Sequence, residues 1–124
     1  LENVWNKFLL SPLEFRDFID KADSPWVQAY FDVGNILLYG FPEQWIAMLG
    51  KRIRKVHLKN YLRASDVFTH LLTGDMDWQK VMRALRQIGY DDYLTAELPG
   101  YRTCPEQMLY DTSAHMDRII RLPG

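Results

Sequence analysis

Hydrophobic residues recur at helical spacing in four stretches of this sequence, and each stretch has recognisable start or stop signals. The stretch SPLE predicts a capping box between Ser11 and Glu14 with a proline at the first helical position. A first helix is therefore expected over Pro12–Lys21. The stretch FPEQWIAMLG predicts a second helix that begins near its proline and stops at Gly50.

The third and fourth helical stretches are DWQKVMRALRQIGY and TCPEQMLYDTSAHMDRII. Asp77 is the expected N-cap residue of the third helix, which Gly89 should end. Thr103 and Glu106 predict a second capping box at the start of the fourth helix. The chain is thus expected to contain four amphipathic helices.

Short hydrophobic runs of strand length lie between these helices: VQAYFDV, IRKVHLK and DYLTAEL. Strands that alternate with amphipathic helices indicate βα units around a parallel sheet, so the expected class is α/β. The opening LENVW is interpreted as the end of a further strand. Residues 1–124 would then form one domain of four βα units, and the long connection at 60–77 is expected to be a lid or a binding loop.

Composition narrows the class of protein. The 124 residues are 48% hydrophobic and carry a net charge of −1, as expected for a single water-soluble domain. This charge balance disfavours nucleic acid and membrane surfaces as partners. A single cysteine, Cys104, and first residues that lack a signal-peptide pattern predict a cytoplasmic protein.

Ionisable side chains lie at or near the carboxyl ends of the predicted strands. Each has an ordinary structural explanation when taken alone, such as a turn cap or a solvated strand end. Because the carboxyl ends of parallel strands meet at one edge of a sheet, recurrence in four successive units predicts that the side chains converge. Three carboxylates and one imidazole suit Mn²⁺, Mg²⁺ or Co²⁺ better than a structural zinc. The residues are Glu2, Asp32, His57 and Glu97.

Five short motifs occur in the order LEN, FDVGN, VHLKN, GDMDW and TAELPGY. In this order they resemble the C-terminal half of the xylose isomerase-like (β/α)8 barrels, a superfamily of sugar and sugar-phosphate isomerases and epimerases, with the strongest resemblance to the 3-epimerases. The resemblance implies half of a TIM barrel, strands five to eight, with helices outside a parallel sheet. A complete barrel of this kind has about 250 residues, so the chain is expected to be a truncated or excised piece.

The resemblance also implies a ligand set and an activity. A divalent metal, which would be Mn²⁺, Mg²⁺ or Co²⁺ with Zn²⁺ as an alternative, would be held by Glu2, Asp32, His57 and Glu97. Glu2 and Glu97 would also be catalytic. One would take a proton from the carbon beside the carbonyl, and the other would return a proton to the opposite face of a metal-stabilised enediolate.

Three further residues are implied to bind the sugar or sugar phosphate: Asn35, Lys59 and Arg63. Lys59 should share the face of His57, because side chains alternate along a strand. Two positions depart from the pattern of many relatives. Asn35 stands where a histidine is common, and Asn60 replaces an aspartate whose charge would orient Lys59 or His57.

A half barrel would leave two unpaired sheet edges and an apolar inner face. Such surfaces pair with other chains, so we expect a homodimer or a higher oligomer that completes the sheet. A monodisperse monomer in sedimentation would contradict this expectation.

Three functions from different classes are considered. The leading one is a metal-dependent sugar or sugar-phosphate isomerase or epimerase, with little turnover expected from the half barrel alone. The alternative is a non-catalytic remnant or assembly module that binds no metal usefully. An apurinic-site endonuclease ranks below both, because such enzymes use extra histidines for a trinuclear zinc site, and Asp66 and His70 have the wrong spacing to supply them.

Overall fold

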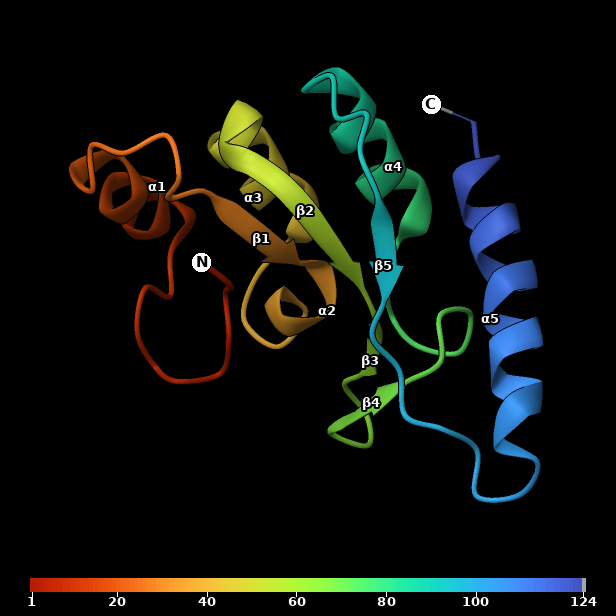
Figure 1. The fold of residues 1–124 in the computed structure, drawn as a ribbon. Helices are drawn as coiled ribbons and strands as arrows, with labels where there is room; N and C mark the ends of the chain where they lie inside the picture. Colours follow the sequence, from red (N-terminus) through yellow and green to blue (C-terminus); the bar gives the residue numbers. More distant parts are fainter. Residues whose placement is uncertain (124) are drawn as a thin grey trace.

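The sheet at the centre of the molecule is parallel, as predicted. A computed structural model describes residues 1–123. The sheet has the strand order β1-β2-β5 and consists of β1 (Ala29–Asp32), β2 (Ile53–Leu58) and β5 (Leu94–Ala96) (Figure 1). An isolated parallel bridge between Glu2 and Tyr30 adds the N-terminal segment beside β1. The spatial order of these segments is therefore also their chain order, as expected for half of a (β/α)8 barrel.

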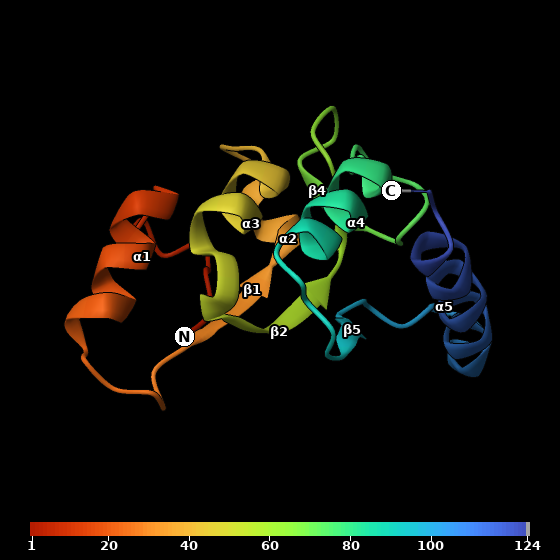
Figure 2. The same cartoon turned by 90° about the horizontal axis from the view of Figure 1, so that it is seen from above.

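Helices cover one side of this sheet. The longer ones are α1 (Pro12–Lys21), α3 (Pro42–Leu49), α4 (Trp78–Gln87) and α5 (Pro105–Ile120), and the short ones are α2 (Val33–Ile36) and the 3-10 helix η1 (Gly50–Arg52). Figure 2 shows α1, α3, α4 and α5 in an arc around one face, with the opposite face uncovered. The four predicted helices are confirmed. Within residues 1–123, none of the helices combines the length and the apolar character that crossing a membrane requires.

The core fills the space between the sheet and the helices. Phe31 on β1 and Val56 and Leu58 on β2 are fully buried. Phe31 stacks on Trp45 of α3, with ring centroids 6.1 Å apart, so these strand side chains point into the helix layer. The hydrophobic stripe of α4 joins the same core through Trp78, Val81, Met82 and Leu85.

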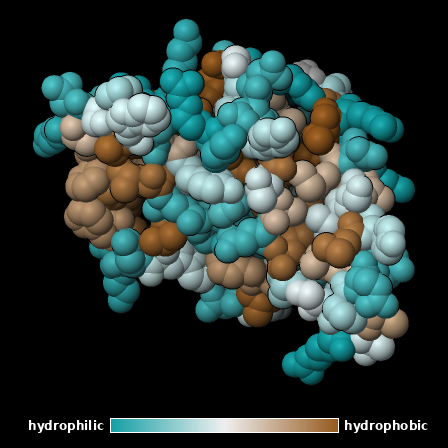
Figure 3. All heavy atoms as spheres, viewed as in Figure 1, coloured by the Kyte–Doolittle hydropathy of each residue, from teal (hydrophilic) through white to brown (hydrophobic). Residues whose placement is uncertain are grey.

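The uncovered face of the sheet is polar, and the expectation of an apolar inner face is wrong. Alternation along β1 and β2 turns the large apolar side chains toward the helices and leaves Tyr30, Lys55 and His57 on the open side. Tyr30 and His57 stack across the two strands with centroids 4.1 Å apart, and Lys55 pairs with Asp92 at 2.8 Å. Figure 3 views this face and shows hydrophilic residues near its middle, with hydrophobic ones over α1 and the segment before it and others toward the α5 side of the molecule.

Local hydrogen bonds and glycines set the helix ends where they were predicted. In the capping box of α1, Glu14 N donates to Ser11 Oγ at 3.1 Å and Ser11 N donates to the Glu14 carboxylate at 3.2 Å. Asp77 caps α4 by accepting a bond from a backbone N–H of the first turn. Gly50 and Gly89 take positive φ values of 54° and 72° just after α3 and α4.

The predicted capping box of the last helix is wrong. Helix α5 begins at Pro105, and Cys104 rather than Thr103 is its N-cap residue. The Cys104 backbone is left-handed, with φ 55° and ψ 61°, and no side chain caps the helix. This turn puts Thr103 outside the position from which a hydroxyl reaches the first helical N–H groups.

The long connection at 60–77 contains regular structure that the sequence analysis missed. Its first part is an antiparallel hairpin of β3 (Asn60–Leu62) and β4 (Val67–Thr69), and Asp66 takes a positive φ of 53° in the turn. Aromatic and β-branched residues on both sides of a polar turn were the available signal. The role of this connection as a lid or binding loop stays a prediction.

Candidate metal centre

Four ionisable side chains meet at the carboxyl edge of the sheet. Glu2 comes from the N-terminal segment, Asp32 ends β1, His57 lies near the end of β2, and Glu97 follows β5. Asp32 pairs in register with His57, and Glu97 N donates to the Leu58 carbonyl, so each group comes from a neighbouring strand segment. One potential ligand atom from each residue lies within 4.8 Å of the other three. The structure thus brings together the four residues that the strand ends suggested.

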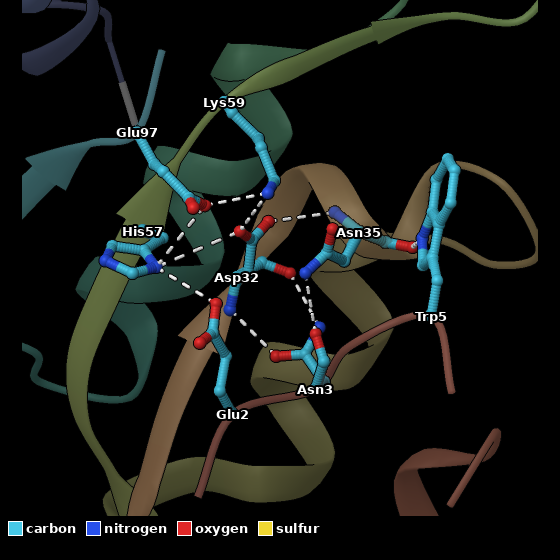
Figure 4. Close-up of polar contacts among 8 residues, drawn as sticks. All are labelled: Glu2, Asn3, Trp5, Asp32, Asn35, His57, Lys59 and Glu97. Atoms are coloured by element: carbon cyan, nitrogen blue, oxygen red, sulfur yellow. Dashed lines mark hydrogen bonds and ion pairs between the residues drawn. The ribbon is translucent and has the colours of Figure 1, made fainter. Parts of the chain in front are cut away.

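His57 presents one ring nitrogen to all three carboxylates (Figure 4). Nδ1 lies 3.1 Å from Glu2 Oε1, 3.7 Å from Glu97 Oε2 and 3.9 Å from Asp32 Oδ2. The imidazole packs against the Tyr30 ring on the open face of the sheet, which restricts its orientation. The cluster therefore combines three carboxylates with a single inward nitrogen.

Asp32 is the buried member of the cluster, with a side chain that is 0% exposed. Its Oδ1 accepts a bond from Asn35 N at 2.8 Å and so caps the one-turn α2. Its Oδ2 is buried and accepts no hydrogen bond, although the Lys59 ammonium lies 3.1 Å away as an ion-pair partner. Burial raises the pKa of Asp32 to about 6, against the opposing effects of the Asn35 N–H and Lys59. Oδ2 is thus a buried carboxylate oxygen that a bound cation would stabilise.

Lys59 lies between Asp32 and Glu97. Its ammonium is 2.7 Å from Glu97 Oε2, 3.1 Å from Asp32 Oδ2 and 4.5 Å from the centre of the Phe68 ring. Burial disfavours the charged lysine, but the hydrogen bond to Glu97 and the nearby Asp32 raise the pKa of Lys59 overall. The same hydrogen bond lowers the pKa of Glu97. Lys59 therefore contributes a positive charge to the cluster from the face that also carries His57.

A chain of buried amides fixes the segment that carries Glu2. Asn3 pairs with the backbone of Asp32: Asp32 N donates to Asn3 Oδ1, and Asn3 Nδ2 donates to the Asp32 carbonyl, both at 2.8 Å. Asn35 Nδ2 donates to the Asn3 carbonyl at 2.8 Å, and Trp5 Nε1 donates to the Asn35 carbonyl at 2.8 Å. These bonds hold Glu2 beside Asp32 through their backbones. No local pattern in the sequence pointed to this role of Asn3, because its partner Asp32 lies 29 residues away.

Two of the predicted substrate residues make structural contacts. Asn35 is only 5% exposed, and its amide supports the N-terminal segment. Arg63 Nε donates to the Leu37 carbonyl at 2.9 Å, and its backbone N–H donates to Asp75 at 2.8 Å. Neither residue belongs to the cluster of four, whereas Lys59 contacts that cluster directly. The substrate roles of Asn35 and Arg63 stay predictions.

Asn60 supports the loop at 71–76 instead of contacting the cluster. The residue is 1% exposed, its Nδ2 donates to the Leu71 carbonyl at 2.7 Å, and its Oδ1 accepts from Met76 N at 2.9 Å. The loop passes so close that a Cβ at Gly74 would lie 2.4 Å from Asn60 Oδ1. An ionised aspartate would have no N–H for the Leu71 carbonyl. The asparagine is therefore explained by the backbone that it holds.

An aromatic wall formed by Trp5, Tyr61 and Phe68 borders the cluster. Phe68 of β4 lies over the Lys59 ammonium, and Trp5 packs on Phe68 with centroids 4.7 Å apart. Tyr61 packs against both rings from the side. Because Trp5 and Phe68 are 40% and 36% exposed, part of their ring surface is open to a ligand.

The donor set fits a divalent cation. Three carboxylates and one imidazole nitrogen match the preference of Mn²⁺, Mg²⁺ and Co²⁺ for oxygen-rich sites. Asp32 Oδ2 is a buried oxygen with the Lys59 ammonium 3.1 Å away as its ion-pair partner, and hydrogen bonds from Asn3 and Asn35 orient the residue that carries it. The residues present therefore suit a metal of this class.

Comparison with known proteins identifies the family. The family model described as xylose isomerase-like TIM barrel matches residues 1–119. This chain belongs to that family. The resemblance inferred from the short motifs and the predicted half-barrel fold are both confirmed. No curated protein matches the sequence significantly.

Solved structures with the xylose isomerase-like fold superpose well on the chain. An L-ribulose 3-epimerase gives a TM-score of 0.78 at 18% identity, over 97% of this chain and 46% of its own. A xylose isomerase domain protein from Planctomyces limnophilus gives 0.77 at 23% identity, over 96% and 43%. A D-tagatose 3-epimerase-like protein gives 0.75 at 21% identity, over 96% and 46%. The chain thus spans less than half the length of each of these proteins.

Proposed function

We propose that this chain supplies the divalent-metal centre and the proton-transfer groups of a sugar or sugar-phosphate isomerase or epimerase. Membership of the xylose isomerase-like family and the fold shared with an L-ribulose 3-epimerase and a D-tagatose 3-epimerase-like protein support sugar chemistry. The observation that carries the proposal is the cluster of Glu2, Asp32, His57 and Glu97, whose ligand atoms lie within 4.8 Å of one another.

In this proposal the four side chains hold Mn²⁺, Mg²⁺ or Co²⁺, with Zn²⁺ as an alternative. When bound, such an ion polarises the carbonyl and neighbouring hydroxyl oxygens of a ketose and acidifies the carbon beside the carbonyl. Asp32 and His57 come from the inner strands and act as ligands. The hydrogen bonds between the Asn3 side chain and the Asp32 backbone hold the ligands Glu2 and Asp32 side by side.

Glu2 and Glu97 are the proposed acid–base pair. They come from the two outer segments of the sheet, so they flank the inner ligands from opposite sides. Their side chains are 34% and 51% exposed, which leaves them accessible to a substrate. One carboxylate removes the proton from the carbon beside the carbonyl, and the other returns a proton to the opposite face of the enediolate, which inverts that carbon.

Lys59 and the aromatic wall are placed to bind the rest of the substrate. An ammonium can donate to a sugar hydroxyl or to a phosphate oxygen. The exposed ring surface of Trp5 and Phe68 offers an apolar contact to the C–H face of a sugar. A sugar or sugar phosphate is therefore the proposed partner, and a net charge of −1 offers no general attraction to nucleic acid.

Calorimetric titration with Mn²⁺ tests the metal centre. We expect saturable binding at one site per chain, weakened at least about tenfold by Glu97→Gln because a charged carboxylate ligand becomes a neutral amide. The matched control is Glu106→Gln, which changes an acidic residue in the first turn of α5 and should bind Mn²⁺ like the wild type. The absence of saturable heat in the wild type would contradict the proposal and favour the non-catalytic remnant or assembly module.

Sugar binding is tested on the Mn²⁺-loaded chain. Titration with a ketose and with the corresponding ketose phosphate should give heat that depends on Mn²⁺, and the stronger of the two ligands reports whether the natural substrate is phosphorylated. If Mn²⁺ binds but neither the ketose nor the ketose phosphate gives heat, the proposal of a metal centre stands and the proposal of a sugar substrate is wrong.

A further inference from the structure

The positive charge of Lys59 sits on the same oxygens that the cluster offers to a metal. Its ammonium lies 3.1 Å from Asp32 Oδ2 and 2.7 Å from Glu97 Oε2. The same two oxygens face His57 Nδ1, at 3.9 Å and 3.7 Å. Lys59 is therefore the counter-charge of the carboxylate cluster in this structure.

The residues around Lys59 hold its side chain in this position. Its side chain is 12% exposed, and its stem crosses Gly34, where a Cβ would lie 2.3 Å from Lys59 Cγ. A glycine at that point leaves space for the stem. The Phe68 ring lies 4.5 Å from the ammonium and offers it a second contact at the mouth of the site. A glycine, an aromatic ring and two carboxylates thus define the place of the lysine, unlike that of a solvated surface lysine.

We propose that Lys59 is an internal cation that neutralises the cluster in the metal-free protein and withdraws from Asp32 and Glu97 when a divalent ion binds. The inference rests on the proposed metal centre. An ammonium and a divalent ion repel each other at separations of a few ångströms, so each disfavours the presence of the other on these two oxygens. Lys59 then makes metal binding an exchange of one cation for another, and the affinity is lower than the four ligands alone would give.

The exchange has a second consequence for the residue itself. An ammonium that leaves the two carboxylates can remain against the Phe68 ring, which belongs to the β3–β4 hairpin at the edge of the site. There its three N–H donors are free for a substrate oxygen. Lys59 is thus released for substrate binding only when the metal is in place, which orders the two binding events.

Replacement of Lys59 by an uncharged residue of similar length tests the exchange. With Lys59→Met we expect Mn²⁺ to bind at least about tenfold more tightly in calorimetry near neutral pH. The metal-free variant should also have a lower melting temperature, because Asp32 and Glu97 have lost their cation, and Mn²⁺ should raise that temperature by more than in the wild type. Lys59→Gln is a second neutral variant with the same expected direction.

Two controls separate the site from general charge effects. Lys59→Arg keeps the positive charge beside the carboxylates and should not tighten Mn²⁺ binding. Lys55→Met removes a charge from the same strand, where the partner is Asp92 at 2.8 Å, and should leave Mn²⁺ affinity unchanged. Equal or weaker Mn²⁺ binding by both neutral Lys59 variants, or equal tightening by Lys55→Met, would overturn the inference and leave the metal centre intact. If the wild type and both neutral variants bind no Mn²⁺, the proposed function fails together with the inference.

Discussion

At the scale of single residues, two buried asparagines support the backbone around the cluster. Asn3 makes two bonds to the Asp32 backbone, as a neighbouring strand would, and is 3% exposed. Asn60 does the same for the loop at 71–76. An amide can donate and accept at once, which a carboxylate cannot do while ionised. Both residues therefore act on the site through the backbone that they hold.

Asn60→Asp tests this use of an amide. The carboxylate would keep the acceptor for Met76 N but lose the donor to the Leu71 carbonyl, in a position that is 1% exposed. We expect the free energy of unfolding in urea to fall by about 1–3 kcal/mol. Asn6→Asp is the control, because the Asn6 side chain only accepts a bond from Phe8 N on an exposed segment, and it should change stability by less than about 0.5 kcal/mol. Equal effects of the two changes would show that the Leu71 bond is not stabilising.

At the scale of the elements, helix ends were predictable where the signal is local. The Ser11 capping box needs only residues within one turn, and it forms as the sequence predicts. The Thr103 box failed because the left-handed backbone at Cys104 sets the start of α5. The partner of Asn3 is 29 residues away in the sequence, so no local pattern reveals it. The four cluster residues were predictable because parallel strands align their ends, whereas the contacts of Lys59 with Phe68 depend on an unpredicted hairpin.

The two helix starts give a paired prediction. Ser11→Ala removes an observed cap and should lower the free energy of unfolding by about 1 kcal/mol. Thr103→Ala removes a hydroxyl from a residue that caps nothing and should change stability by less than about 0.5 kcal/mol. Thermal unfolding of both variants under the same conditions measures the difference. A larger loss in Thr103→Ala than in Ser11→Ala would contradict the assignment of Cys104 as the N-cap.

At the scale of the whole molecule, the helices cover only one face of the sheet, so the other face and the sheet edges are exposed. In the described residues β5 pairs only with β2, so its outer edge keeps free backbone groups. Helix α5 has 16 residues, of which only Ile119 is buried, and its Leu109 and Tyr110 are 64% and 72% exposed. Since the middle of the open face is polar, the edge of β5 and the apolar side of α5 are among the surfaces that favour association, together with the exposed apolar residues over α1 and the segment before it.

We predict that the chain self-associates through these surfaces. Sedimentation should show a dimer or a larger species, and Leu109→Lys should shift the population toward the monomer by placing a charge in the contact. Met48→Lys adds the same charge to α3 at a residue that is 42% exposed, and it should leave the sedimentation unchanged. A monodisperse monomer for the wild type would exclude the predicted oligomer.

The two oxygens of Asp32 constrain this position in a way that matters for any mutational study of the site. Oδ1 holds the first turn of α2 through Asn35 N, while Oδ2 faces the cluster. Asp32→Ala would remove both, so a weaker site in that variant would mix a relaxed helix with a lost charge. Asp32→Asn keeps an acceptor for the helix and removes the charge. The cap of α2 can therefore be made by either aspartate or asparagine, whereas the charge of the cluster requires aspartate. Only Asp32→Asn separates the loss of charge from the loss of the cap.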